Sequence, residues 1–330
     1  MANLPHERVN CVTFVIPVRD DATRLQQCLS SLQALNLDGL SKEVIVADNG
    51  SSDGSGEIAR QAGARVISLP KLTVAQVRNR AAALARGQLI AFVDADHLLD
   101  PQWLACGISA ISEPGVGAAG APCKAPQQPT WVQRTYDRLR ARPSVRSDVE
   151  WLGSGNILVR RDAFIALGGF DENLQSCEDV DFCQRLRRAG WRVVAEPGMV
   201  SIHLGDPPSL RALFLGELWR GRDNFKVTLR GPLTVRSVAS LIIPLYNLSL
   251  LAIAISSIAA LPVWPASWKI AATALAVFSF LCILRALRMD RYANGIRSLF
   301  ENLAVAVVYE LARALALVSR ATHRVRRYGR

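Results

Sequence analysis

The stretch Leu89–Asp96 (LIAFVDAD) sets five apolar residues directly before two carboxylates. A short, continuous apolar run of this kind predicts a strand that is buried on both faces. In an extended chain the side chains of Asp94 and Asp96 point to the same side, so together they can hold a hard divalent cation, Mn²⁺ or Mg²⁺. Such a cation neutralises a diphosphate and stabilises it as a leaving group. A D-x-D pair alone is weak evidence, because many such pairs are solvated acids in loops. The prediction rests on the position of this pair at the end of an apolar strand.

Strand and helix patterns alternate upstream of this stretch. The expected strands are Val12–Pro17, Glu43–Asp48 and Arg65–Leu69, and the expected helices are Asp21–Leu35, Gly54–Ala62 and Thr73–Ala85. The alternation predicts an α/β fold with a mostly parallel sheet and helices on both faces. Ligands of such sheets bind beyond the carboxyl ends of the strands, where Asp20 and Asp48 also lie.

Two further polar segments are candidates for the site. In Asp48–Gly54 (DNGSSDG), Asp48 and Asp53 could bond a nucleotide base or ribose, or the segment is an ordinary turn with Asp53 as a helix N-cap. Glu178 and Asp179 open a predicted helix, where carboxylates either complement the helix dipole or supply a general base for an attacking hydroxyl. His203, expected past the last strand of the domain, is either structural or a third metal ligand through its neutral imidazole.

The C-terminal part has a different character. No charged residue occurs from Ser237 to Trp268, and two apolar runs, Val238–Leu261 and about Ala266–Leu284, are each long enough to cross a bilayer. We expect a transmembrane hairpin; a buried hairpin of a soluble domain is the alternative. Basic residues flank the hairpin on one side and predict that both of its ends are cytoplasmic: Arg230, Arg236, Arg285, Arg288 and Arg291.

Two more helices are expected around the hairpin. Ser209–Phe225 has the spacing of a surface-lying helix. Leu299–Val318 is apolar but interrupted by charges, so it is either an interfacial amphipathic helix, which we favour, or a third span packed by protein.

Charge and cysteine usage narrow the function further. The net charge is +11; residues 1–205 hold 22 basic and 22 acidic residues, and residues 206–330 hold 17 and 6. The excess therefore accompanies the apolar runs, which favours lipid headgroups over nucleic acid as the partner.

Seven scattered cysteines without a C-x-x-C pair argue against a disulfide framework or a zinc site. Met1–Asn10 lacks an apolar signal core, so we expect a cytoplasmic first domain.

Several ordered blocks over about residues 10–205 resemble the family 2 glycosyltransferases, which have a GT-A fold. The blocks are Val15–Asp20, Asp48–Ser55, Val77–Ala81, Asp94–Asp96, Gly153–Asn156, Arg161–Phe164, Gly168–Glu172, Glu178–Asp181 and Ala189–Val193. Asp20 departs from the family pattern, which often has Asn or Glu there, and Ala81 stands where Gly is frequent.

The resemblance implies a role for each matching residue. The nucleotide pocket would contain Pro17, Asp20, Asp48, Asp53, Arg78 and Asp94. Asp94 and Asp96 would bind the metal with His203. Asp179 would be the catalytic base, supported by Glu178. The acceptor side would contain Gly153, Ser154, Gly155 and Trp191.

The sequence thus predicts an inverting, metal-dependent transferase that moves one sugar from a nucleotide-sugar donor to a membrane-associated, lipid-linked acceptor in glycan or cell-envelope synthesis. A processive enzyme is disfavoured because Gln184–Arg188 lacks the Trp of a Q-x-x-R-W block. A transferase with a soluble acceptor and a non-catalytic scaffold are the alternatives. A nucleotidyltransferase is disfavoured because no Gly-rich phosphate loop follows the first strand of this sequence. The expected domains are 1–205 (transferase), 206–236 (interfacial linker), 237–288 (hairpin) and 289–330 (basic tail).

Overall fold

The computed structural model describes residues 9–140, 142–289 and 295–319. They divide into two compact units: the first reaches Pro126 and resumes at 142–205, and the second joins Gln127–Arg140 to the chain from Asp206 onward. Nothing in the sequence pattern indicated that Gln127–Arg140 belongs with the C-terminal part. The predicted flanking residue Arg291, the first eight residues and the tail beyond Ser319 lie outside the described residues.

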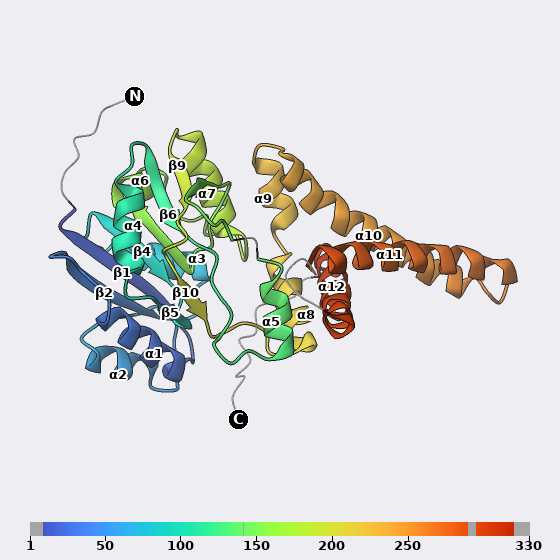
Figure 1. Cartoon of the computed structure of the whole chain (residues 1–330), viewed down its shortest axis with the longest axis horizontal. Coiled ribbons are helices and arrows are strands. Elements are labelled where there is room, and N and C mark those ends of the chain that lie inside the picture. Colours follow the sequence, from blue (N-terminus) through green and yellow to red (C-terminus); the bar gives the residue numbers. More distant parts are fainter. Residues whose placement is uncertain (1–8, 141, 290–294, 320–330) are drawn as a thin grey trace. The chain divides into compact units, whose positions relative to one another are not determined.

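The first unit is built on one mixed sheet of eight strands (Figure 1). Strands β3, β2, β1 and β4, which run inward from one edge, are parallel, β8 is antiparallel to β4 and β6, and β9 is parallel to β6. The predicted α/β class with a mostly parallel, mixed sheet is confirmed. In sheet order the strands are β3 (Arg65–Ser68), β2 (Ser41–Asp48), β1 (Cys11–Val18), β4 (Leu89–Val93), β8 (Asn156–Arg160), β6 (Val116–Gly120), β9 (Arg192–Ala195) and β7 (Ser147–Asp148).

Each face of this sheet carries its own hydrophobic core. In β1, Phe14 and Ile16 point into one core, whereas Val15 points into the other, as the two-residue period of a strand requires. The first core is covered by α1 (Ala22–Gln33), α2 (Ser55–Gln61) and α4 (Trp103–Ile111). The second is covered by α3 (Val74–Ala82), α6 (Arg161–Ala166) and α7 (Glu178–Arg188). Helices on both faces explain why β4 is apolar at every position.

The sheet gathers the predicted polar segments at one edge. Val18 pairs with Asp48 at the end of the β1–β2 ladder, and β4 runs parallel on the other side of β1. The carboxyl ends of β2, β1 and β4 therefore lie next to one another. A second, two-stranded sheet pairs β5 (His97–Leu99) with β10 (Ser201–His203). The expectation that His203 follows the last strand is therefore wrong, because it is the final residue of β10.

The second unit is helical. Its elements are α5 (Trp131–Asp137), α8 (Leu210–Arg220), α9 (Asn224–Arg230), α10 (Val235–Ala259), the short 3-10 helix η1 (Pro265–Ser267), α11 (Trp268–Met289) and α12 (Ile296–Ala316). The single helix predicted at Ser209–Phe225 is wrong: α8 ends at a Gly221 cap and α9 restarts after Asp223. Gly221 has right-handed helical angles (φ −74°), and its lack of a side chain lets α12 approach, because a Cβ there would come 2.6 Å from the Cβ of Ala316.

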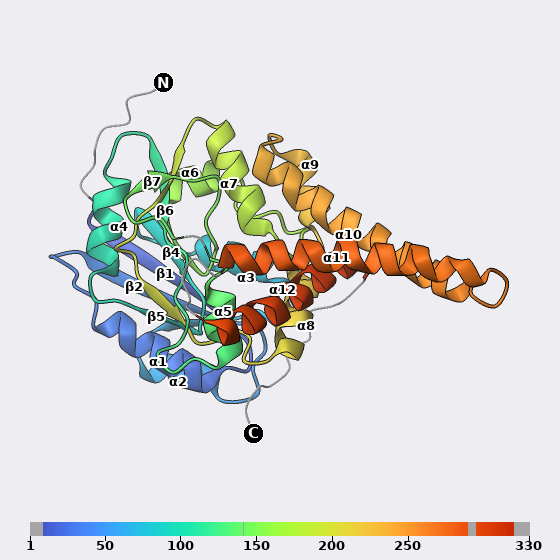
Figure 2. The ribbon, with the colours of Figure 1, turned by 45° about the vertical axis from the view of Figure 1, so that its right-hand side comes forward.

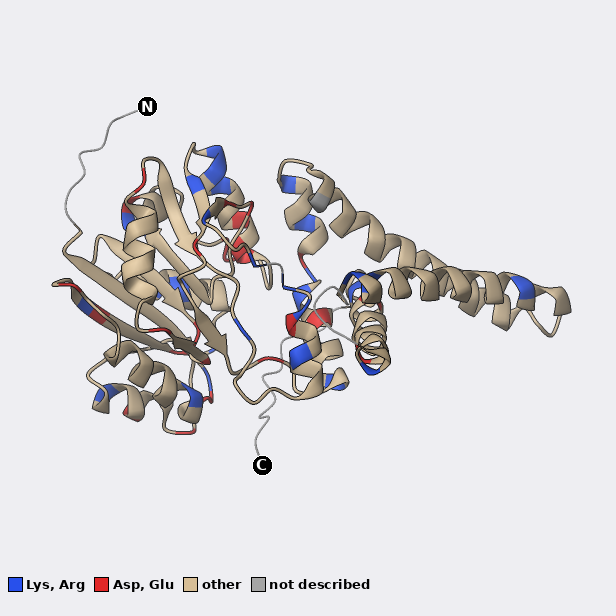
Figure 3. Ribbon diagram, viewed as in Figure 1, with Lys and Arg blue, Asp and Glu red and all other residues tan. Residues whose placement is uncertain are grey.

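Helices α10 and α11 form the predicted hairpin and run side by side in Figures 1 and 2. Their apolar windows have mean hydropathies of 2.1 and 2.2, and only 22% and 28% of the window residues are buried. Most of the hairpin ribbon lacks charge in Figure 3. By length and composition both helices could cross a membrane.

Pro244 interrupts the hydrogen bonding of α10. Because proline has no N–H, the carbonyl of Ser240 loses its helical partner, and the side chain of Asn224 donates to it instead at 3.0 Å. A freed carbonyl in an apolar helix is thereby satisfied from a neighbouring helix.

Helix α12 packs against α5, α8, α10 and α11. Its Glu310 is 3% exposed, accepts a hydrogen bond from the amide of Asn247 at 2.8 Å and pairs with Arg285. A helix enclosed in this way is not the surface-lying amphipathic helix that we favoured for Leu299–Val318. The charge of Glu310 is satisfied by buried polar partners rather than by water.

Candidate active site

The D-x-D segment is a turn rather than the end of a strand. β4 stops at Val93, and the backbone N–H of His97 donates to the carbonyl of Asp94 at 3.0 Å. The prediction that extended geometry aligns the two carboxylates is therefore wrong. The turn nevertheless brings ligand atoms of Asp94, Asp96 and His97 within 4.8 Å of one another.

His203 completes this group from the other strand of the small sheet. Its Nε2 lies 3.3 Å from Oδ2 of Asp96, and Nη1 of Arg24 lies 3.8 Å from the same oxygen. Burial acts to raise the pKa of Asp96, but His203, His97 and Arg24 together outweigh burial and hold that pKa well below its usual range. Carboxylate oxygens suit Mg²⁺ or Mn²⁺, so the two aspartates fit the expected ion.

Two glycines leave room for these carboxylates. A Cβ built on Gly155 would come 2.5 Å from Oδ2 of Asp94, and one on Gly205 would come 1.9 Å from Oδ2 of Asp96. Both distances are shorter than the 3.0 Å below which a Cβ essentially never approaches a non-bonded heavy atom. The carboxylates can approach the backbone in this way only because both positions are glycine.

Arg78 links this group to the start of α7. Its two terminal nitrogens donate to Asp94 at 2.6 Å and to Glu178 at 2.7 Å, and the side chain is 3% exposed. Burial lowers the pKa of Arg78, but the two carboxylates outweigh burial and raise it, so the guanidinium stays charged. Its Nε has no hydrogen-bond partner among the residues that the structure describes. The planar guanidinium suits such a two-carboxylate bridge because its donors point in fixed directions.

The N-terminus of α7 presents two acids in different environments. Glu178 accepts from Arg78 and from the hydroxyl of Ser154 at 3.1 Å. Asp179 accepts from the backbone N–H groups of Ser154 at 3.2 Å and Val180 at 2.8 Å. Burial, with the negative charge of Glu178, raises the pKa of Asp179 to about 7. Asp179 is therefore a stronger base than an ordinary aspartate and is still half ionised near neutral pH.

The nucleotide candidates lie at the ends of β1 and β2. Asp20 has a φ of 51° and accepts from the backbone N–H of Ser52 at 2.8 Å, which ties the two loops together. Asp48 accepts from the backbone N–H of Ser51 at 2.8 Å. Pro17 lies directly opposite Ala47 in the ladder. These three residues share the strand edge that also leads to Asp94.

Asp53 is occupied by backbone groups. Its carboxylate accepts from the N–H of Ala22, at the start of α1, at 2.8 Å and from the hydroxyl of Ser55 at 2.6 Å. The alternative that Asp53 is the N-cap of the next helix is wrong, because Gly54 holds that position. In the structure Asp53 ties the loop that follows Asp48 to the start of α1.

Trp191 does not join the other candidates. It follows α7 at the end opposite Asp179, where its ring lies 5.9 Å from the guanidinium carbon of Arg160 and its side chain covers Gly117. By contrast His97, which we did not single out, is buried beside Asp94 and Asp96. Its signal in the sequence was its position directly after the D-x-D pair.

Comparison with known proteins identifies the family of this chain. Residues 13–168 match the sequence model described as glycosyl transferase family 2. The N-acetylglucosaminyl-diphospho-decaprenol L-rhamnosyltransferase of Mycobacterium tuberculosis is 30% identical over 288 residues, an alignment that covers 68% of this chain and 92% of that protein. The chain belongs to glycosyl transferase family 2. It is therefore a glycosyltransferase.

One further relative and one solved structure are similar to this family 2 glycosyltransferase. Glycosyltransferase AglE of Haloferax volcanii is 28% identical over 245 residues, which covers 70% of this chain and 78% of AglE. The mannosyltransferase PcManGT of Pyrobaculum calidifontis, solved with GDP-Man and Mn²⁺, superposes with a TM-score of 0.59 at 16% identity, covering 94% of this chain and 88% of that chain. The structural likeness shows the GT-A fold.

The glycine at position 155 provides a first test of the site. We expect Gly155→Ala to weaken Mn²⁺-dependent donor binding by roughly 5- to 150-fold, because the overpacking cost of about 1–3 kcal/mol falls on the Asp94 carboxylate and 1.4 kcal/mol is tenfold. The new methyl group would displace the Asp94 carboxylate, which Arg78 prevents from rotating away. Gly153→Ala is the matched control, since its Cβ would meet only Asp179 at 3.9 Å. Equal donor affinities in the two variants, measured by calorimetric titration, would contradict the expectation.

Proposed function

We propose that this family 2 glycosyltransferase moves one sugar, with inversion, from a nucleotide-sugar donor to a lipid-linked acceptor, using Mn²⁺ or Mg²⁺. The observation that carries the proposal is the Arg78 bridge, which joins Asp94 of the metal-ligand group to Glu178 beside Asp179. The metal-ligand group would bind the donor diphosphate, and Asp179 would bind the acceptor hydroxyl. The bridge holds these two groups next to each other, as a single displacement reaction requires.

The donor side of the proposal uses the edge of β1, β2 and β4. Pro17, Asp20, Asp48 and Arg78 line the nucleotide pocket, with Asp53 holding its loop. Asp94 and Asp96 hold the cation with His203. The cation, when bound, neutralises the diphosphate and stabilises it as the leaving group.

The acceptor side uses the loop Gly153–Gly155 and the start of α7. Asp179 accepts the proton of the acceptor hydroxyl while the hydroxyl oxygen attacks the anomeric carbon from the side opposite the diphosphate, which inverts that carbon. Its pKa of about 7 suits a general base at neutral pH. Glu178 is already held by Arg78 and Ser154, so we assign it to positioning and to raising the basicity of its neighbour.

A lipid-linked acceptor is supported by two observations. The rhamnosyltransferase relative is named for a diphospho-decaprenol acceptor, and this chain carries an apolar hairpin. A screen of nucleotide-sugar donors, run with and without membrane lipid extract, tests the proposal by nucleotide release and product formation. Transfer that needs the extract supports it, transfer to a water-soluble glycan alone favours a soluble acceptor, and absence of donor turnover with Mn²⁺ favours a non-catalytic scaffold.

The metal assignment predicts the behaviour of Asp96→Ala. We expect donor affinity in Mn²⁺ to fall at least about 10-fold, since even partners outside the ligand shell contribute about 10–100-fold to metal affinity. Asp100→Ala, a nearby exposed acid that caps a turn, is the matched control and should bind donor normally. Calorimetric titration with and without a chelator measures both. An Asp96→Ala protein with wild-type affinity and wild-type response to chelator would disprove the assignment.

The hairpin proposal concerns topology. We propose that α10 and α11 cross the membrane and that both ends of the hairpin are cytoplasmic, because Arg230, Arg285 and Arg288 flank it on one side. A membrane-impermeant thiol reagent added to intact cells should label Val263→Cys, whose position in the turn is 91% exposed, and miss cysteine tags at either end of the chain. A labelled C-terminal tag would instead require an odd number of spans.

A further inference from the structure

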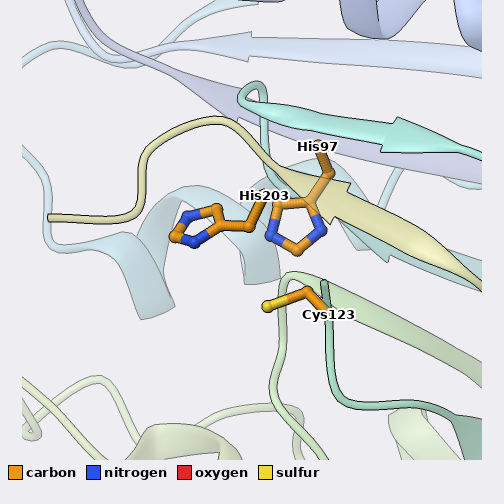
Figure 4. Close-up of side chains that lie close together, drawn as sticks. All are labelled: His97, Cys123 and His203. Atoms are coloured by element: carbon orange, nitrogen blue, oxygen red, sulfur yellow. The ribbon is translucent and has the colours of Figure 1, made fainter. Parts of the chain in front are cut away.

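A thiol lies beside the two histidines of the metal-ligand group. His97, Cys123 and His203 each offer a ligand atom, and these atoms all lie within 4.8 Å of one another. Figure 4 shows the Cys123 sulfur next to both imidazole rings. The expected sugar transfer assigns no role to this thiol.

The backbone explains why residues so distant in sequence meet. His97 and His203 are direct partners in the antiparallel pair of β5 and β10, so their side chains share a face. Cys123 is in the next extended segment: the N–H of Lys124 donates to the carbonyl of Ser201 at 2.8 Å, and the N–H of His203 donates to the carbonyl of Lys124 at 2.9 Å. Lys124 lies alongside Ile202 in parallel orientation, so Cys123 points to the same side as His203.

The chemistry of this group differs from that of the carboxylates. One thiolate and two imidazoles are soft to borderline ligands that select Zn²⁺ over Mg²⁺ or Mn²⁺. Bond lengths of about 2.0–2.1 Å to nitrogen and 2.3 Å to sulfur set ligand atoms roughly 3.3–3.6 Å apart around tetrahedral zinc, so small side-chain rotations suffice. The Ser201 hydroxyl, 3.2 Å from Nδ1 of His97, can orient that ring as outer partners of zinc ligands do.

We infer that His97, Cys123 and His203 form a second cation site, selective for Zn²⁺, that shares His203, and also His97, with the D-x-D group. A neutral imidazole has one lone pair for a ligand bond, so His203 serves one ion at a time. Zinc at this site therefore removes a ligand from the Mn²⁺ or Mg²⁺ set and inhibits transfer. The binding step stands by itself, whereas the inhibition rests on the proposed function.

The binding step is tested with the purified full chain in detergent, free of metal and of donor. Titration with Co²⁺ should give a near-ultraviolet thiolate-to-cobalt charge-transfer band, and Zn²⁺ should abolish the band by displacement. Cys123→Ser should lose the band and bind Zn²⁺ at least about 10-fold more weakly. Cys11→Ser, which removes a partly exposed thiol at the start of β1, controls for unrelated cysteines. It should keep the cobalt band and the wild-type affinity for Zn²⁺. A band that persists in Cys123→Ser, or equal Zn²⁺ affinities in the wild type and this variant, overturns the site.

The sharing of His203 is tested by the effect of one ion on the other. In transfer assays at fixed Mn²⁺, added Zn²⁺ should inhibit the wild type at a concentration at least about 10-fold lower than Cys123→Ser requires. Equal inhibition of both proteins overturns the sharing. A protein that gives the cobalt band but transfers no sugar with any donor would refute the proposed function and leave the zinc site intact.

Discussion

Arg78→Met should destabilise the protein by about 3 kcal/mol or more, the lower end of the cost of breaking a buried ion pair. Methionine keeps most of the side-chain length but leaves Glu178, which is 7% exposed, and Asp94 without their shared cation. Because the Asp94 side chain is 34% exposed, water compensates part of the loss there, and we expect the lower end of that range. Thermal unfolding of the purified protein measures the effect.

Arg80→Met is the matched control. Arg80 is on the same helix but exposed, and exposed substitutions change stability by only about 0.5 kcal/mol. Arg78→Lys retains the charge but replaces two directed donors by one ammonium, so it should be intermediate in stability and still weak in donor binding. Wild-type stability together with wild-type donor binding in Arg78→Met would show that the bridge holds neither the fold nor the site.

The sheet was predictable because its central strands are buried on both faces. Burial leaves β4 with an unbroken apolar run, and the predicted limits of Leu89–Val93 agree with the structure. Predicted limits for β1 and β2 differ by one or two residues, since strand ends depend on pairing partners rather than on composition. The helices between them follow from the same alternation of strand and helix patterns.

The small sheet could not be predicted in the same way. β5 and β10 have three residues each, too few for a periodic pattern, and their pairing joins His97 to His203 across more than a hundred residues. The interpretation that scattered cysteines argue against a zinc site considered only ligands close in sequence. Cys123 meets the histidines through backbone pairing of Lys124, which leaves no trace in residue spacing.

The helical unit shows a second limit. Glu310 makes the pattern of α12 look amphipathic, but the charge is matched by Arg285 and Asn247 from other helices. Sequence patterns distinguish polar from apolar residues; they do not distinguish a polar residue that faces water from one that faces a buried partner.

Asp179→Asn should lower the rate of sugar transfer by about 10²–10⁴-fold, the usual contribution of a general base. Asparagine has nearly the same shape but cannot take the proton of the acceptor hydroxyl. Its single oxygen can keep the hydrogen bond from Val180 or from Ser154 but not both, at a cost of about 1 kcal/mol. Donor affinity in Mn²⁺ should stay near wild type, because Asp94 and Asp96 are unchanged.

The pH dependence gives this prediction a second signature. The wild-type transfer rate should rise with pH through about 7, as Asp179 loses its proton, and the residual rate of Asp179→Asn should lack that step. A carboxyl whose pKa is raised on folding stabilises the fold below its unfolded value near 3.8, and that contribution is lost as pH rises through about 7. Asp179→Asn should therefore gain stability relative to wild type as pH increases across this window.

Asp181→Asn separates this role from a general effect on the helix. Asp181 is in the same turn of α7 and pairs with Arg185 at 2.8 Å, so its loss removes a helix-terminal charge without touching the proposed base. Because Asp181 is 5% exposed, Asp181→Asn should reduce stability by about 2 kcal/mol, the figure for a partly buried helix-end charge, and leave the pH profile in place. Transfer by Asp179→Asn at a near wild-type rate, with the step at pH 7 intact, would move the base to Glu178 or Asp181. The matched pair therefore assigns the acceptor proton to one carboxylate among the three at the start of α7.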